Sequence, residues 1–286
     1  MEIGCGKGAF LRKLVQADGS GNRGVGLDPT YEGELESLGG RLRFEKRFYG
    51  PECTDIPVDV VGCRHVLEHV PDPMGMLHSL RESLTRSPNA MVFFETPCVS
   101  WILKNRVIWD FFYEHCSLFS VESLSHAFSL AGFEVREVRH VFGGQYLWLE
   151  AGLADGGKPV TFDPTGIVES AIEFSGQEER FNKSWAEIIH RLTESGKVAI
   201  WGAGAKGVTF ANLIDPEGRY LDCVVDLNPS KQGRFIPGTG HPIVNPRQLT
   251  ARKVRSVVIM NENYYHEICK FVTDEGISLE LIPAVI

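Results

Sequence analysis

A short apolar run, a glycine-rich turn and a helical segment follow one another twice in this sequence. The first turn lies in Glu2-Ile3-Gly4-Cys5-Gly6-Lys7-Gly8, and the second, Gly202-Ala203-Gly204-Ala205-Lys206-Gly207, follows the apolar run 197–201. Glycines let the backbone turn sharply and approach a ligand closely beside the start of a helix. Because such a unit opens the sheet of Rossmann-like folds, we expect an α/β protein with two Rossmann-like domains in series.

Short apolar runs alternate with amphipathic segments through the first half of the chain, as expected for a parallel sheet with crossover helices. The expected strands after the first turn are 24–27, 41–45, 58–63, 90–95, 134–140 and 146–151, and the expected helices are 9–16, 74–84 and 121–131. Only a few residues, including Gly143 and Gly144, separate the last two strands, which is hairpin spacing. We therefore expect the first sheet to end in an antiparallel pair.

The second half of the chain begins with a change of composition. Gly, Asp, Pro and Lys are frequent between residues 152 and 164, which indicates a linker, and a polar helical stretch follows at 165–194. A second α/β pattern has its expected strands at 197–201, 222–226, 256–260 and 279–283. The predicted organisation is a first domain over residues 1–152, a linker and helical segment over 153–195, and a second domain over 196–286.

Composition argues against several classes of protein. The 286 residues carry a formal net charge of −8, which argues against a nucleic-acid backbone as partner. No apolar run reaches the roughly 18 residues that indicate a membrane span, and no signal-peptide pattern opens the chain. The seven cysteines are scattered and form no CxxC pair, so neither a zinc knuckle nor a disulfide framework is indicated. We expect a reduced, cytoplasmic protein without a metal site.

The first glycine turn has the surroundings of a ligand site. Asp28 stands at the end of the second expected strand, where an acidic side chain accepts ribose hydroxyls in related folds. The segment Cys63-Arg64-His65-Val66-Leu67-Glu68-His69 follows a later strand, and ligands of open α/β sheets lie outside such strand ends. We expect His65 and its neighbours to contact the cofactor. A turn that only packs helix on strand, with Glu68 and His69 as a polar helix start, is the alternative.

Four strings in this order, EIGCGKG, HVLEHVPDP, FYEH and WGAGAKG, resemble the bacterial sugar C-methyltransferases. The resemblance covers nearly the whole chain and implies a class I methyltransferase domain followed by a second Rossmann-like domain. It also implies S-adenosylmethionine as cofactor and a nucleotide-linked keto-sugar, or a related small molecule, as substrate. The cofactor-binding residues are then expected to be Glu2, Gly4, Gly6, Gly8, Asp28, Arg64 and His65.

The sequence departs from this family at its start. The family carries an N-terminal zinc-binding module rich in CxxC pairs, whereas this sequence has none and opens inside the first expected strand. We therefore expect an N-terminally truncated chain that lacks whatever side chains the module supplies. Loss of the module also leaves open a binding protein without catalytic activity.

The connection after the strand 90–95 contains Trp109-Asp110-Phe111-Phe112-Tyr113-Glu114-His115. C-methylation next to a carbonyl needs a base that removes a carbon-bound proton and a donor that stabilises the enolate, and histidine titrates in the useful range. The resemblance implies that His115 is this base and that Tyr113 and Glu114 position the sugar or stabilise the enolate. In the family the tyrosine can stand one residue earlier, where this chain has Phe112. A purely structural His115 at the mouth of a loop is the alternative.

The second glycine turn fits G-x-G-x-x-G, with Asp226 about twenty residues further on. Alone, this pattern indicates a dinucleotide site and supports an NAD-dependent oxidoreductase as the alternative function. Lys206 adds a positive charge that suits a phosphate, and the segment 228–233 matches the second domain of the resembling family. We expect the nucleotide or another anionic part of the substrate to be bound by Lys206, Asn228, Lys231 and Tyr264. A turn that only packs is again possible, and the oligomeric state is not indicated.

Overall fold

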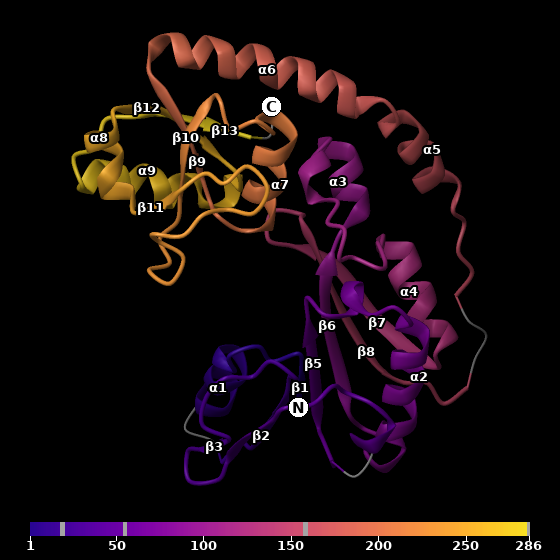
Figure 1. The fold of residues 1–286 in the computed structure, drawn as a ribbon. Helices are drawn as coiled ribbons and strands as arrows, with labels where there is room; N and C mark the ends of the chain where they lie inside the picture. Colours follow the sequence, from indigo (N-terminus) through magenta and orange to yellow (C-terminus); the bar gives the residue numbers. More distant parts are fainter. Residues whose placement is uncertain (18–20, 54–55, 157–159, 285–286) are drawn as a thin grey trace. The chain divides into compact units, whose positions relative to one another are not determined.

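The computed structural model describes the chain apart from residues 18–20, 54–55, 157–159 and 285–286 (Figure 1). Its contacts divide the chain into two compact units. The first unit comprises Met1–Trp101 and Tyr113–Val168, and the second comprises Ile102–Phe112 and Glu169–Ile286. Part of the expected linker, residues 157–159, lies outside the described residues. The predicted domain limits at residues 152 and 195 remain a prediction.

The first unit is built on an eight-stranded sheet with the order β3-β4-β2-β1-β5-β6-β8-β7. Its strands are β1 (Glu2–Ile3), β2 (Gly24–Leu27), β3 (Glu36–Ser37), β4 (Leu42–Glu45), β5 (Val60–Arg64), β6 (Met91–Pro97), β7 (Phe133–Val141) and β8 (Tyr146–Leu153). The central strands from β4 to β6 pair in parallel, while β8 is antiparallel to both β6 and β7. The expected terminal hairpin is confirmed, and β8 lies between β7 and the parallel strands.

Helices cover both faces of this sheet (Figure 1). They are α1 (Ala9–Gln16), α2 (Pro73–Ser83), α3 (Val99–Asn105), which crosses the boundary between the units, and α4 (Val121–Leu130). On one face, α1 buries Leu11 among Leu42 and Phe44 of β4. On the other, α2 and α4 bury apolar residues such as Leu80 and Phe128 in the larger core. The sequence predicted α1, α2 and α4 but not α3.

The second unit contains a five-stranded, all-parallel sheet with the order β11-β10-β9-β12-β13. Its strands are β9 (Lys197–Trp201), β10 (Leu221–Val225), β11 (Ile243–Val244), β12 (Val254–Ile259) and β13 (Glu280–Pro283), and its helices include α6 (Gln177–Ser195), α7 (Ala205–Ile214), α8 (Leu249–Arg252) and α9 (Tyr265–Asp274). The α/β fold with two Rossmann-like domains is thereby confirmed. No helix in the described parts of the chain is long and apolar enough to cross a membrane.

The polar stretch 165–194 forms two helices where the sequence suggested one. α5 (Thr165–Phe174) ends before α6 because Gly176 adopts a left-handed backbone with φ 78°. Glycine reaches that conformation without steric cost, so it interrupts the helical hydrogen bonds at this point. α6 buries one face through residues such as Trp185, Ile189 and Leu192.

The segment Ile102–Phe112 packs with the second unit although it lies in the first half of the sequence. The ring of Trp109 lies 5.2 Å from the ring of Phe181 and 5.6 Å from that of Phe210. Next to it, the ammonium group of Lys206 donates a 2.7 Å hydrogen bond to the carboxylate of Asp110. None of the local sequence patterns indicated that this stretch packs with the second unit.

Candidate active site

The three glycines of the first turn have different structural roles. All have a left-handed backbone, with φ of 69° at Gly4, 53° at Gly6 and 72° at Gly8. A Cβ atom on Gly4 would lie 2.1 Å from Val66, and one on Gly8 would lie 2.3 Å from Phe44. A Cβ atom on Gly6 would meet no described atom within 4 Å. Packing therefore requires Gly4 and Gly8 to be small, whereas Gly6 borders open space that a ligand can occupy.

Asp28 connects the end of β2 to this turn. One oxygen of its carboxylate, Oδ2, accepts a 2.8 Å hydrogen bond from the Gly6 N–H. The other, Oδ1, accepts from the backbone N–H and the hydroxyl of Thr30. A carboxylate offers about four lone-pair sites, so these three bonds leave room on Oδ2 for one more donor, such as a ribose hydroxyl.

Glu2 is a buried acid immediately before the turn. It is 4% exposed, and its Oε2 atom has no hydrogen-bond partner among the residues that the structure describes. Burial raises the pKa of Glu2 to about 7. Because an unpaired buried carboxylate oxygen is costly, this atom is a suitable acceptor for a cationic group such as the ammonium of a bound amino acid.

Arg64 and His65, at the end of β5, both contact Glu95 of β6. The Arg64 guanidinium lies over the ring of Phe10, at 4.4 Å, and donates two hydrogen bonds of 3.2 Å to Glu95 Oε1. His65 places Nε2 2.9 Å from the same oxygen. Its backbone is in the left-handed region with φ 54°, a strained conformation that is concentrated at functional sites.

Two carboxylates control the protonation of His65. Burial alone would lower its pKa, but Glu68 and Glu95 together outweigh this effect and raise the pKa to about 9. For Glu95, burial opposes ionisation, yet His65 and Arg64 leave its pKa below the usual value. His65 therefore carries a positive charge at neutral pH.

We expect an NMR titration of His65 to show a midpoint near pH 9, because the imidazolium is held by two carboxylates. Since the folded pKa exceeds the unfolded value of about 6.5, the stability from this group should be complete below pH 6.5 and be lost as the pH rises through 9. Glu95→Gln should lower the midpoint, with Glu137→Gln as a surface control. A midpoint at or below 6.5 in the unmodified protein would contradict the arrangement.

Glu68, His69 and His115 converge in the first unit. The rings of His69 and His115 meet edge to face at 4.8 Å, and His69 Nδ1 lies 3.3 Å from the carbonyl oxygen of Glu114. Burial lowers the pKa of His115, with Glu68 acting in the opposite direction. A lowered pKa keeps His115 in its neutral, proton-accepting form at neutral pH. The side chain of Tyr113 is fully exposed.

Within the residues that the structure describes, these three side chains form a group that could hold a metal ion, because their ligand atoms lie within 4.8 Å of one another. In a tetrahedral zinc site with bonds of about 2.0–2.1 Å, neighbouring ligand atoms are about 3.3 Å apart. Glu68, His69 and His115 would thus have to move closer to bind zinc. The expectation of no metal site rested on the cysteine pattern and did not consider this group.

The sequence pattern indicated no role for the side chains of Glu68 and His69 beyond a polar helix start, and none for Glu95 or Thr96. The spacing of His65 and Glu68, three residues apart after a strand end, was a usable signal, because a turn over so few residues can bring two polar side chains together. The approach of His115 to Glu68 had no local signal, because 47 residues separate them along the chain.

The second glycine turn is occupied by contacts within the protein. A Cβ atom on Gly207 would lie 1.9 Å from the carbonyl oxygen of Gly202, so this glycine is required by packing. Asp226 Oδ2 accepts from the Ala203 N–H and from the Lys231 ammonium, each at 3.1 Å. The acid that would bind a dinucleotide ribose is thus already paired with a cation, which argues against the NAD alternative.

The residues expected to bind the substrate are only partly gathered. Lys206 and Tyr264 line a cavity of about 670 Å³ beside the second turn, with apolar walls that include Phe112, Trp201 and Met260. Asn228 and Lys231 are not among its described lining residues. Lys231 pairs with Asp226, and Asn228 accepts hydrogen bonds from the backbone and hydroxyl of Ser230.

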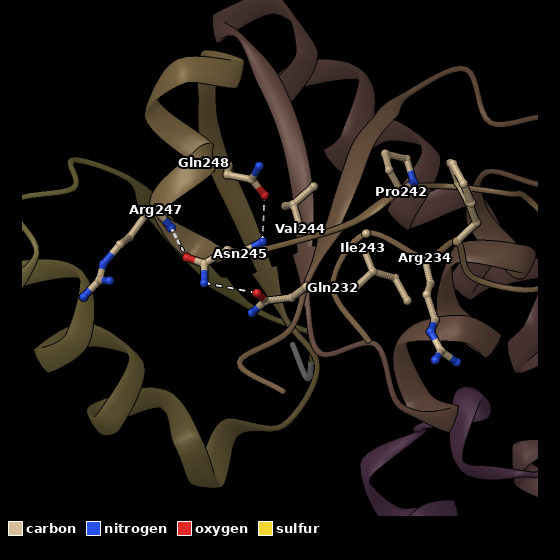
Figure 2. Close-up of a pocket in the computed structure, with 10 residues that line it drawn as sticks. Gln232, Arg234, Pro242, Ile243, Val244, Asn245, Arg247 and Gln248 are labelled. Carbon is tan, nitrogen blue, oxygen red and sulfur yellow. Dashed lines mark hydrogen bonds between the residues drawn. The ribbon is translucent and has the colours of Figure 1, made fainter. Parts of the chain in front are cut away.

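Figure 2 shows another cavity of the second unit, of about 610 Å³, beside the edge strand β11. The Asn245 amide group donates to Gln232, and the Asn245 N–H donates to the side chain of Gln248. The side chain of Asn245 also accepts from the Arg247 N–H, which caps a short helix. No residue predicted from the sequence lines this cavity. The helix-capping pattern Asn245-Pro246-Arg247-Gln248 is the sequence feature that could have located this part of the cavity lining.

Comparison with known proteins identifies the family. A family model described as a methyltransferase domain matches residues 1–138, and one described as a C-methyltransferase C-terminal domain matches residues 167–276. The C-methyltransferase NovU of Streptomyces niveus is 26% identical over 94% of this chain and 67% of its own length. The two domain matches and the similarity to NovU support an S-adenosylmethionine-dependent methyltransferase.

Other relatives match only the methyltransferase domain. A ubiquinone biosynthesis O-methyltransferase of Pseudoalteromonas translucida is 32% identical over 34% of this chain and 42% of its own length. A crystal structure of the Burkholderia thailandensis 1,6-didemethyltoxoflavin-N1-methyltransferase is 16% identical, covers 54% of this chain and 70% of that one, and has a TM-score of 0.42. The name C-methyltransferase is carried by the family model over residues 167–276 and by NovU.

Proposed function

We propose that this methyltransferase methylates a carbon atom next to the carbonyl of a nucleotide-linked keto-sugar or related small molecule. The supporting observation is a histidine with a lowered pKa, His115, beside Glu68 and His69. It occurs in a chain that is similar to a C-methyltransferase over most of its length. A carbon-bound proton next to a carbonyl is less acidic than a hydroxyl proton, so methylation of carbon depends strongly on a placed base.

The residues around the first turn fit the cofactor. The Asp28 carboxylate can accept from ribose hydroxyls, and the unpaired Glu2 oxygen can accept from the ammonium of the methionine part. The open space at Gly6 leaves room for the ligand backbone, while Gly4 and Gly8 shape the turn. Arg64 and His65 complete the expected set at the end of β5. Bound S-adenosylmethionine supplies an electrophilic methyl group on a sulfonium.

The reaction begins when His115 accepts the proton from the carbon next to the substrate carbonyl. The electrons of that C–H bond form the enolate. With S-adenosylmethionine bound, the enolate carbon would take the methyl group as the carbon–sulfur bond breaks, and the electron pair of that bond would remain on sulfur in the neutral thioether that leaves. Glu68 stabilises the imidazolium on His115, and Glu114 and Tyr113 position the sugar or stabilise the enolate oxygen. His115 then releases its proton to solvent and returns to the neutral form.

In the second unit, the cavity beside the second turn would receive the nucleotide part of the substrate. Tyr264 and the apolar walls suit a planar base, and Lys206 is the proposed polar contact within the cavity. Asn228 and Lys231 do not line it as described, so their proposed contacts would be with a part of the substrate that extends beyond the cavity. Lys206 and Lys231 are each paired with a carboxylate in the ligand-free protein. A phosphate would have to compete with these carboxylates, so the contribution of each lysine is part of the proposal.

Product analysis tests the proposed function directly. The protein would be incubated with carbon-13-labelled S-adenosylmethionine and a panel of nucleotide-linked keto-sugars, and proton–carbon NMR would locate the methyl group. A methyl bonded to carbon supports the proposal, and one bonded to oxygen or nitrogen overturns it. Calorimetry with S-adenosylmethionine and NAD separates the alternative, because tight binding of NAD alone would indicate an oxidoreductase.

Asp28→Ala should weaken S-adenosylmethionine binding more than tenfold, because charge-assisted hydrogen bonds to the ribose are lost. Such bonds contribute roughly 1.5–3 kcal/mol each. Thr30→Ala is the matched control, since it removes one partner of Asp28 but keeps the carboxylate, and it should bind nearly as the unmodified protein does. Calorimetry that gives equal affinities for Asp28→Ala and the unmodified protein would exclude Asp28 from the cofactor site.

A further inference from the structure

Glu68 is a buried carboxylate at the centre of the proposed catalytic site. It is 1% exposed and lies in the short helical turn Leu67–His69 that follows β5. Its Oε2 atom accepts a 3.1 Å hydrogen bond from the hydroxyl of Thr96 on β6. Its Oε1 atom lies 3.5 Å from Nδ1 of His65. This fully buried acid is therefore held by Thr96 of β6 and by His65, which directly follows β5.

The backbone of Glu68 also holds the segment that follows His115. Its carbonyl oxygen accepts from the Cys116 N–H at 2.7 Å and from the Ser117 N–H at 3.2 Å. These two residues come directly after His115 in the sequence. The backbone of Glu68 therefore fixes the two residues after the candidate base, and its carboxylate lies within 4.8 Å of the His115 ring nitrogen.

We propose that Glu68 is a positioning residue for the methyl transfer, which fixes the ring of His115 and stabilises the imidazolium that forms when His115 accepts a proton. The inference rests on the proposed function of His115 as base. The ligand atoms of Glu68 and His115 lie within 4.8 Å of each other. At that separation, a fully buried carboxylate beside the partly buried His115 favours the protonated ring over the neutral one.

The charges around His115 show why Glu68 has this effect. Besides Glu68, the ionisable groups that act on the ring are His69, Glu114 and His65. Both His69 and His65 disfavour a proton on His115, while Glu114 favours it. Among these groups Glu68 has the largest effect, second only to burial itself. His65 lies 3.5 Å from Glu68 and 2.9 Å from Glu95, and these two carboxylates raise its pKa to about 9.

The test compares Glu68→Gln with two controls. Glu68→Gln keeps the shape and removes the charge, Thr96→Val keeps the charge and removes the hydroxyl bond, and Glu68→Asp restores the charge at a shorter reach. Each variant is first shown by calorimetry to bind S-adenosylmethionine normally. The titration of His115 is then measured by NMR on nitrogen-15-histidine protein. Exchange of the substrate's acidic proton with deuterated water is measured against pH.

In Glu68→Gln, we expect the midpoint of the His115 titration to fall by about one pH unit. The plateau rate of exchange should fall by roughly threefold to tenfold, because a weaker general base removes the proton more slowly, by at most the same factor as its pKa changes. Thr96→Val should leave the midpoint near that of the unmodified protein, and Glu68→Asp should recover much of the shift. A purely structural Glu68 would lower the amount of active protein without moving the midpoint. An unchanged midpoint and rate in Glu68→Gln would overturn the proposal.

The two proposals can fail separately. If the unmodified protein transferred methyl groups but exchanged no substrate proton, the enolate function would be wrong. The titration of His115 would still report its coupling to Glu68, because it needs no substrate. If exchange occurred and depended on His115 but not on Glu68, only the positioning role would be lost.

Discussion

Replacing His115 by asparagine should lower kcat by about 10²–10⁴ and leave cofactor binding intact, because a placed general base contributes a factor of that size. The structure gives the reason for choosing this residue, since burial lowers the pKa of His115 and leaves the ring neutral and ready to accept a proton. The same variant should stop exchange of the substrate's acidic proton with deuterated water, measured by proton NMR without cofactor. Exchange isolates proton removal from methyl transfer.

Tyr113→Phe is the companion variant and should reduce exchange less than His115→Asn does. Its hydroxyl would stabilise the enolate rather than take the proton, and its side chain is fully exposed in the ligand-free protein. Exchange at the unmodified rate in His115→Asn would place the base elsewhere. His65 would then be the first residue to test, although its pKa of about 9 makes it a poor base at neutral pH.

Lys206→Met should destabilise the second unit by about 3–5 kcal/mol, because it leaves the Asp110 carboxylate buried without its cation. Asp110 is 7% exposed, and its Oδ1 atom has no hydrogen-bond partner among the described residues. Burial raises the pKa of Asp110, and Lys206 opposes that effect. Denaturant unfolding followed by tryptophan fluorescence would measure the loss, since Trp109 lies in the same packed segment.

The loss of stability in Lys206→Met should depend on pH. Without Lys206, the pKa of Asp110 should rise further, so the penalty should be largest at neutral pH and shrink toward the unfolded aspartate pKa of about 3.9. Lys231→Met is the matched control, because its pair with Asp226 is 39% exposed on the lysine side and such pairs contribute about 0–1 kcal/mol. The double variant Asp110→Leu/Lys206→Met should recover most of the stability. Equal effects of the two lysine variants would refute the argument.

This prediction also bears on the role expected of Lys206 in substrate binding. A raised KM for a nucleotide-linked substrate in a Lys206 variant has two possible origins, a lost phosphate contact or a displaced segment Ile102–Phe112. The lost phosphate contact is isolated when KM is measured under conditions where the variant is fully folded and its cofactor affinity is unchanged. The stability measurement therefore comes before the kinetic one.

The strands and glycine turns could be predicted from sequence because each depends on local patterns. A buried parallel strand is a short apolar run, and a left-handed turn requires glycine, so 24–27 and 197–201 were located correctly. The short strands β3 and β11 and the short helix α8 were missed, since two to four residues carry too little pattern. Packing against neighbours decides such elements.

The site was only partly predictable for a different reason. Asp28 and the first turn follow from a fixed spacing around a strand. The contact of His115 with Glu68 depends on how a long connection returns to the sheet, and the pairing of Lys206 with Asp110 joins residues 96 positions apart. The positive charge of Lys206 suggested that it binds a phosphate. A single sequence does not indicate that Lys206 forms an ion pair with the buried Asp110.

Asp28 and Asp226 hold their glycine turns by the same contact, a carboxylate that accepts a backbone N–H of the turn. In the second sheet, Lys231 adds a positive charge from within the chain, so that turn is electrically complete without a ligand. In the first sheet, Glu2 Oε2 has no partner among the described residues. A cation bound there should therefore stabilise the folded first unit against unfolding, whereas the second turn already has its cation within the chain and should gain less from a ligand.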